Sequence, residues 1–450
     1  MSAAAGVAAP AELLLRRILS LAVPTSLAAG VQVAALLGET WLAARQGTMA
    51  LSAFAVVMPF TQLMGQMSAG AMGGGVVSAI ARTLGAGKRE EAGDLVAHAM
   101  LIALAAAMLF MLGLVVFPRT LLGAIAGPDL AELAAPYATI LFGLGAVPFW
   151  MTNTLASVLR GGGRHALVAR VMVVGWLAYP PLAWVCMEPL GMGLAGGGVA
   201  FGAVWWVAAL VMGAVAARGG AGFAAHWLAR PRRGLFWRIL SGGLLACALA
   251  SVANLTIILV TAQLARYGVV AVAAYGIAAR MEFLMIPLVF GLGSALTALV
   301  GGAVGAGDWA TARRTAWAGG LLAFALAGTA GLFAALMPGW VAERFSADPA
   351  VVAIATRALR IMGPAFGGFG LGMALYFASL GAGRMRWPMA AGISRIALAA
   401  GGGWVLAHPL GMGMDGYFLG VALGITAYGA LTAAAVRPGV WPGRTMGRTR

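Results

Sequence analysis

The feature that most constrains this chain is a series of long apolar stretches that recurs from one end to the other. A hydrocarbon core about 30 Å thick is crossed by roughly 20 apolar residues of helix. We find twelve stretches of this length and expect twelve membrane-spanning helices. They cover residues 14–44, 50–80, 93–117, 133–159, 165–187, 193–217, 236–265, 271–301, 314–337, 352–380, 387–407 and 415–436.

The composition supports lipid as the solvent for these stretches. The chain has 450 residues, of which 62% are hydrophobic and 9% are charged, whereas about 25% of the residues in soluble domains are charged. A single soluble core also stops growing near roughly 250–300 residues. The expected fold class is therefore an all-α integral membrane protein, which crosses the bilayer many times.

The net charge of +16 would also fit a nucleic-acid-binding protein, but its distribution argues against one. With the N-terminus taken as cytoplasmic, 22 of the 29 basic residues fall in cytoplasmic segments, Arg160 and Arg395 among them. Six fall in outer segments, and Arg280 lies within a span. The positive-inside rule explains this asymmetry. We expect cytoplasmic N- and C-termini and no nucleic-acid partner.

The two halves of the chain carry matching segments whose residue numbers differ by a constant offset of 220. A single glycine match means little in a chain with 67 glycines, but a shared offset at four separate places indicates an internal repeat. The pairs are Leu84-Gly85-Ala86-Gly87 with Val304-Gly305-Ala306-Gly307, Pro118 with Pro338, Gly161-Gly162-Gly163-Arg164 with Gly381-Ala382-Gly383-Arg384, and Pro189-Leu190-Gly191-Met192-Gly193 with Pro409-Leu410-Gly411-Met412-Gly413.

Each repeat contains six spans, an even number, so both repeats enter the membrane from the same side and are parallel. We expect two six-helix lobes with a central cleft. The predicted limits are an N-lobe at 1–217, a cytoplasmic linker at 218–235, a C-lobe at 236–436 and a cytoplasmic tail at 437–450.

Most of the 13 acidic residues lie in loops or at helix ends, and two, Glu39 and Glu282, lie well inside spans. A charge at the bilayer centre costs at least ~2.5–3.5 kcal/mol, and residues that bear this cost are usually functional. A buried carboxyl group is also easier to protonate than one in water, so it can carry protons. Gln32 and Ala35 share a helix face with Glu39, which suits a cavity wall. The alternative is a glutamate at a helix end that reaches the outer interface.

Arg280 lies at a depth comparable to that of Glu39, by a count of about 1.5 Å of helix per residue. It is therefore a candidate charge partner of Glu39 across the cleft. Glu282, two residues further on, faces elsewhere. The alternative is that Arg280 and Glu282 each pair within their own lobe and hold helices together.

Four amide side chains inside spans are, with Gln32, candidates to line a substrate cavity: Gln62, Gln66, Asn153 and Asn254. The alternative is hydrogen bonding between helices, which contributes about 0.6 kcal/mol on average.

The sequence gives no support for metal binding, nucleotide binding or catalysis. The histidines and the two cysteines do not cluster at ligand spacing, so we expect no metal site. Lys88 is the only lysine, which excludes a P-loop, and Gly368-Phe369-Gly370-Leu371-Gly372 lies within a span instead of following a strand. Paired catalytic groups are also lacking in the spans. We expect no cofactor and no enzyme activity.

Two segments resemble a known family. Glu39-Thr40-Trp41-Leu42-Ala43-Ala44-Arg45-Gln46-Gly47 and Tyr275-Gly276-Ile277-Ala278-Ala279-Arg280-Met281-Glu282 are similar to the corresponding segments of the multidrug and toxic compound extrusion (MATE) family, and most of all to its DinF-like bacterial branch. The resemblance implies alternating-access export of organic cations or amphipathic toxic compounds, coupled to inward proton or sodium flow. It also implies a bacterial inner-membrane location, and we expect a monomer.

The chain departs from the family pattern at its acids. The acid of the first span is usually aspartate but is Glu39 here, and the fifth span, at 165–187, carries Tyr179-Pro180-Pro181. Some family members carry acids in the seventh and tenth spans, but the corresponding spans here, at 236–265 and 352–380, contain none. A sodium site is therefore less expected, and proton coupling is favoured. A flippase for lipid-linked precursors, from a related branch of the superfamily, is the alternative function. Its cargo would need a more basic cavity than Arg280 alone provides.

Overall fold

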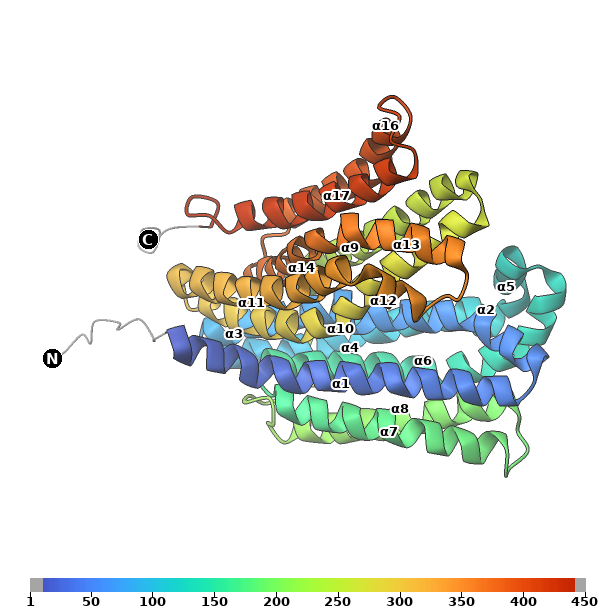
Figure 1. The fold of residues 1–450 in the computed structure, drawn as a ribbon. Helices are drawn as coiled ribbons and strands as arrows, with labels where there is room; N and C mark the ends of the chain where they lie inside the picture. Colours follow the sequence, from blue (N-terminus) through green and yellow to red (C-terminus); the bar gives the residue numbers. More distant parts are fainter. Residues whose placement is uncertain (1–10, 442–450) are drawn as a thin grey trace. The chain divides into compact units, whose positions relative to one another are not determined.

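The structure is a computed structural model that describes residues 11–441. In this part of the chain the regular elements are all helices (Figure 1). The first half contains α1 (Ala11–Arg45), α2 (Thr48–Gly65), α3 (Gly73–Gly85), α4 (Arg89–Met111), α5 (Pro118–Ala126), α6 (Pro128–Gly161), α7 (His165–Met187) and α8 (Leu194–Ala217). The second contains α9 (Arg233–Leu264), α10 (Val269–Gly305), α11 (Trp309–Leu336), α12 (Pro338–Glu343), α13 (Pro349–Met362), α14 (Phe366–Ala382), α15 (Arg386–Ile396), α16 (Gly403–Ala407) and α17 (Met414–Ala435).

Short stretches of other helix types extend or join these elements. The π-helical turns are η1 (Gln66–Met72), η2 (Leu112–Val116) and η5 (Ala397–Gly402), and the 3₁₀ turns are η3 (Ala265–Tyr267) and η4 (Gly363–Ala365). Joined in this way, the described residues form twelve helices long and apolar enough to cross a membrane. Each boundary lies within five residues of the one predicted from the sequence, which confirms the all-α membrane fold.

The contacts divide the chain into two compact units. One is Pro24–Ala250, and the other contains the residues up to Val23 and those from Ser251 onward. Both boundaries fall within a continuous helix, α1 in the first case and α9 in the second. The predicted lobe limits follow the sequence repeat and stay a prediction. Of the predicted C-terminal tail, residues 442–450 lie outside the described residues, as do residues 1–10 of the predicted N-lobe.

The first turns of α1 and α9 explain where these boundaries fall. Ile18 and Ala22 of α1 are buried in a cluster with Val289 of α10. Leu235 and Ile239 of α9 are buried in the core of the Pro24–Ala250 unit. Each repeat therefore begins with a helical segment that packs into the unit formed mainly by the other repeat.

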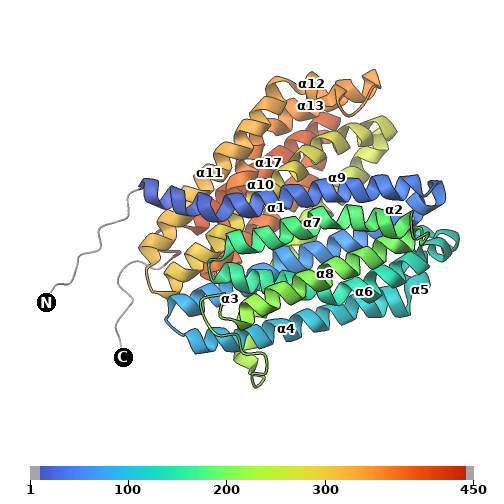
Figure 2. The same ribbon diagram turned by 90° about the horizontal axis from the view of Figure 1, so that it is seen from below.

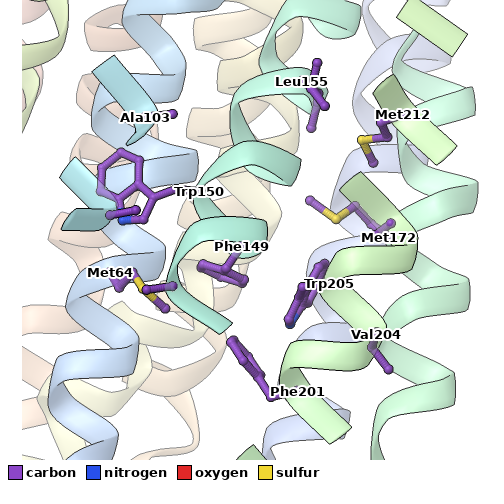
Figure 3. Packing of buried hydrophobic residues seen from close by; sticks show 14 of the residues in the cluster. Met64, Ala103, Phe149, Trp150, Leu155, Met172, Phe201, Val204, Trp205 and Met212 are labelled. Carbon is purple, nitrogen blue, oxygen red and sulfur yellow. The ribbon is translucent and has the colours of Figure 1, made fainter. Parts of the chain in front are cut away.

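The core of the Pro24–Ala250 unit contains a group of packed aromatic rings among aliphatic residues (Figure 3). Phe149 of α6 lies against Phe201 and Trp205 of α8, with ring centroids 5.3 Å and 5.1 Å apart. Glycines let these two helices approach, and they run side by side (Figure 2). A Cβ atom on Gly145 would lie only 2.5 Å from the ring of Phe201. Small residues at such crossings are the usual means of close packing in membranes.

The segment between α8 and α9 is attached to the start of α4. The backbone N–H of His226 donates to the carbonyl of Gly93 (3.2 Å), and the N–H of Arg232 donates to Nε2 of His98 (2.9 Å). A Cβ atom at Gly93 would lie 2.5 Å from the carbonyl oxygen of Ala224. Glycine is therefore needed at position 93 for this segment to lie so close to α4.

The N-terminus of α11 provides a stability prediction. Asp308 is the N-cap residue, and its Oδ1 accepts from the N–H of Thr311 (2.9 Å). Hydrogen bonds from Thr311 hold the pKa of the Asp308 carboxyl below its ordinary value. We expect Asp308→Ala to lower the unfolding free energy by about 1 kcal/mol. Since the folded-state pKa is lowered, this contribution is present above the ordinary pKa and is lost as the pH falls through the folded value.

Thermal unfolding in detergent, from neutral pH to successively lower pH, measures the effect. Lys88 occupies the equivalent N-cap position of α4 in the first repeat, and its side chain forms no capping hydrogen bond. Lys88→Ala is the matched control and should change stability little. A loss in Asp308→Ala that is no larger than in Lys88→Ala, or that does not diminish at low pH, would contradict the assignment.

Candidate functional site

The acid predicted from the first span lies in a buried hydrogen-bonded cluster. Glu39 of α1 is 8% exposed. The hydroxyl of Tyr179 on α7 donates to its Oε1 at 2.5 Å, and the hydroxyl of Tyr137 on α6 donates to the same oxygen at 3.3 Å. Three helices therefore meet at one carboxyl group within the Pro24–Ala250 unit. We call Glu39, Tyr137 and Tyr179 the acid–tyrosine cluster.

The two tyrosines are held by the aromatic core and not by the carboxyl alone. Tyr179 packs edge-to-face against Trp176 and Phe201, with centroids 6.3 Å and 5.8 Å apart. Tyr137 lies 6.3 Å from the ring of Phe54 on α2. Each ring is thus held in position by packing that does not depend on its hydrogen bond to Glu39. Such preorganisation keeps the donors in place whether the carboxyl group carries a proton or not.

α1 and α7 are also neighbours beside the cluster. A Cβ atom on Gly38, beside Glu39, would lie at an ordinary contact distance, 3.6 Å, from the side chain of Pro180, beside Tyr179. The two-proline turn of α7, noted in the sequence as a departure from the family pattern, therefore packs against the acid-bearing helix. The chemistry of the cluster is that of one carboxyl group able to hold either a proton or a cation.

Sequence reasoning did not assign either tyrosine to the site. Tyrosine is scarce in this chain, with seven residues in 450. Two of the seven lie within the fourth and fifth spans, where an amphipathic ring in lipid needs a partner for its hydroxyl. The signal was weak, because Tyr275, Tyr376, Tyr417 and Tyr428 also lie within spans.

The five predicted cavity residues have different surroundings in the structure. Asn153 of α6 is buried, and its Nδ2 donates to the Ser68 hydroxyl in η1 at 3.0 Å. This is a hydrogen bond between helices. Gln32 and Gln62 are half-buried and Gln66 is exposed. Asn254 belongs to the other unit and is exposed there. Their role in binding substrate stays a prediction.

The second intramembrane acid has an arginine partner. Glu282 of α10 forms an ion pair with Arg395 of α15, and the two side chains are 10% and 8% exposed. The guanidinium of Arg395 also lies over the rings of Phe369 and Tyr428, 5.5 Å and 5.9 Å from their centroids. The π-helical turn η5 begins two residues after Arg395, and such turns widen a helix locally.

Arg395 corrects one of the sequence assignments. The charge count groups it with the basic residues of cytoplasmic segments, but it lies inside the predicted span 387–407, and the structure buries it within the span Arg386–Ala407. Arg280 is exposed on α10. Its predicted pairing with Glu39, which belongs to the other unit, stays a prediction.

A metal site is not evident in this geometry. Within residues 11–441, no three His, Cys, Asp or Glu side chains gather where they could hold a metal ion.

Comparisons with known proteins agree with the repeat. The MatE family model matches residues 24–185 and 244–405, so the starts of the two matches are separated by the same offset of 220. Together the two matches cover more than two thirds of the chain. No curated protein sequence matches the chain significantly.

Solved structures give the same fold at low sequence identity. A MOP superfamily transporter from Pyrococcus furiosus superposes with a TM-score of 0.84 and 21% identity, over 96% of this chain and 98% of the other. An outward-facing multidrug resistance MATE transporter of the same superfamily gives 0.85 and 21%, over 96% and 98%. A mutant of the Vibrio cholerae MATE transporter VcmN gives 0.87 and 20%, over 95% and 97%. The matched relatives are transporters, not enzymes, and this chain belongs to the MATE family of membrane transporters.

Proposed function

We propose that this protein is a secondary active efflux transporter, which exports organic cations or amphipathic toxic compounds in exchange for protons by alternating access. The observation that carries the proposal is the acid–tyrosine cluster: a carboxyl group buried in a span and hydrogen-bonded to two neutral hydroxyls. We also propose that both termini are cytoplasmic, on the basis of the positive-inside pattern. The family resemblance suggests a bacterial inner membrane, and we expect a monomer there.

The two intramembrane acids differ in a way that supports this assignment. Glu282 already has a cationic partner in Arg395, so a substrate cation would have to displace an arginine to reach it. The partners of Glu39 within its own unit are the hydroxyls of Tyr137 and Tyr179. Hydroxyls stabilise a carboxylate without neutralising it. Glu39 is therefore the acid that can exchange one positive species for another.

Competition between a proton and an organic cation for Glu39 couples proton entry to export of the cation. A bound proton neutralises the carboxyl group and removes the electrostatic attraction for an organic cation. Loss of the proton restores that attraction. If the inward-open and outward-open states differ in their affinity for the proton, binding shifts the population between them. Proton entry then drives cation exit.

The ion pair of the second acid also bears on the coupling ion. Sodium is a hard cation and needs several oxygen ligands, as such cations generally do. Because Arg395 forms an ion pair with the carboxylate of Glu282, fewer oxygen atoms in that unit are free to bind a sodium ion. This supports protons over sodium, which remains the alternative coupling ion.

Transport in reconstituted vesicles tests the proposal. Vesicles are loaded with ethidium, whose charge does not titrate, and are diluted into acidic or sodium-containing medium. We expect an inward proton gradient to accelerate ethidium release and a protonophore to abolish the acceleration. An equal sodium gradient at constant pH should have no effect. Release driven by sodium alone, or by neither gradient, would contradict proton antiport.

A further inference from the structure

An apolar groove on the unit that contains α10 and α11 has no role in the function proposed above. Its volume is about 630 Å³, within the range of about 300–1,000 Å³ typical of small-molecule sites. Met281 and Met285 of α10 form one wall, and α11 forms the other from Leu322 to Ala334. The lining is almost entirely aliphatic and aromatic.

The dimensions of the groove match half a bilayer. Leu322 and Ala334 are twelve positions apart on α11, which is roughly 18 Å of helix. Half of a hydrocarbon core about 30 Å thick is roughly 15 Å. The groove thus runs along α11 for about the depth of one leaflet.

The groove ends at an arginine and a tryptophan. Trp340 of α12 and Arg344, directly after that helix, both line the groove, and the guanidinium lies 4.9 Å from the centre of the indole ring. The Trp340 ring packs edge-to-face on Phe333 with centroids 5.7 Å apart. Tryptophan and arginine together mark the level of lipid headgroups in membrane proteins.

Arg344 has no acidic partner in the described part of the chain. It forms no ion pair within residues 11–441. Its chain neighbour Glu343 is exposed and does not line the groove. A planar guanidinium that is exposed, stacked on an aromatic ring and not paired with a carboxylate is well suited to bind phosphate.

We propose that this groove binds one anionic phospholipid, with an acyl chain along α11 and the headgroup phosphate on Arg344. The charge at the mouth decides between occupants. An organic cation, the substrate class proposed for transport, would be repelled by Arg344, whereas an anionic headgroup is attracted. The apolar lining suits the acyl chain of the lipid, and the two methionines can adapt to the shape of that chain.

Lipid binding to the purified protein tests this inference. Native mass spectrometry counts the lipids retained, and thermal unfolding in detergent measures the stabilisation by phosphatidylglycerol and by phosphatidylcholine with the same chains. For the wild type we expect one tightly retained phosphatidylglycerol and a larger stabilisation by that lipid than by phosphatidylcholine. Arg344→Gln should lose the preference and the retained lipid.

Two further variants distinguish binding of the acyl chain from binding of the headgroup. Ala325→Trp places a large ring in the groove from an exposed position of α11 and should reduce the stabilisation by both lipids. Arg266→Gln removes another arginine of the same unit, which lies in η3 outside the groove, and should keep the preference for phosphatidylglycerol.

Three results would overturn the proposal. One is an unchanged lipid preference in Arg344→Gln. Another is an equal loss in Arg344→Gln and Arg266→Gln, which would indicate a general effect of surface charge. The third is displacement of the retained lipid by ethidium at transport concentrations, which would make the groove part of the substrate path. The proton dependence of transport is measured separately, so failure here leaves the proposed function intact.

Discussion

Glu39→Gln is expected to abolish ethidium efflux driven by a proton gradient while leaving the protein folded in the membrane. Glutamine has nearly the same volume as glutamate, and its carbonyl oxygen can still accept hydrogen bonds from Tyr137 and Tyr179. What it lacks is a proton that can leave. The acid–tyrosine cluster would therefore remain assembled but would no longer exchange a proton for a cation.

The measurement is ethidium release from vesicles under an inward proton gradient. We expect the rate for Glu39→Gln to fall to that of protein-free vesicles. Glu132→Gln is the matched control, because Glu132 is an exposed acid of α6 that pairs with Arg119 of α5 and should transport normally. Gradient-driven efflux by a folded Glu39→Gln variant would show that the proton carrier lies elsewhere.

Tyr179→Phe gives an intermediate test of the same site. It removes the shorter of the two hydrogen bonds to Glu39 and keeps the aromatic packing against Trp176 and Phe201. The carboxylate then loses one donor, which makes its charged form harder to bury. We expect reduced but measurable efflux. A rate as low as that of Glu39→Gln would mean that Tyr179 itself takes part in proton transfer.

The fold could be predicted because its determinants are local in the sequence. Twelve apolar stretches define twelve spans in any arrangement, and the offset of 220 is readable without coordinates. The predicted ends of the spans differ from the helix ends in the structure by only a few residues, because hydropathy changes sharply where loops begin. Even so, the sequence did not indicate that Ile18 and Ile239, at the start of each repeat, pack into the unit formed by the other repeat.

The candidate site was only partly predictable because its partners are distant in the chain. Glu39 stands out as an acid in an apolar span, but Tyr137 and Tyr179 lie 98 and 140 residues away. Nothing local shows that their hydroxyls converge on it. Asn153 was identified from the sequence, but the sequence could not show what its side chain contacts. An amide in a span looks the same whether it faces a cavity or, as here, donates to Ser68 on a neighbouring helix.

Arg395 was counted with the cytoplasmic residues although it lies inside the predicted span 387–407, nine residues after the start of α15. As with Glu39, the partner that makes its burial possible is distant in the chain. Its burial is tolerated because Glu282, 113 residues away, neutralises it. The pairing of two rare charges becomes visible only when the helices are packed.

That pairing leads to the largest stability effect we expect in this chain. Arg395→Met keeps an unbranched apolar side chain in place of the arginine stem but leaves the Glu282 carboxylate buried without its partner. Breaking a buried ion pair from one side costs about 3–5 kcal/mol. We therefore expect a large loss of folded protein and a much lower unfolding temperature in detergent.

The double variant and a surface pair provide the controls. Arg395→Met with Glu282→Gln removes both charges and should recover much of the loss, since residues in one ion pair are energetically coupled. Arg357→Met breaks an arginine–carboxylate pair with Asp415 in the same unit, whose side chains are 53% and 29% exposed. Exposed pairs contribute only about 0–1 kcal/mol. If Arg395→Met is no more harmful than Arg357→Met, or if the double variant is no better than Arg395→Met alone, burial of the charge pair is not what stabilises this unit.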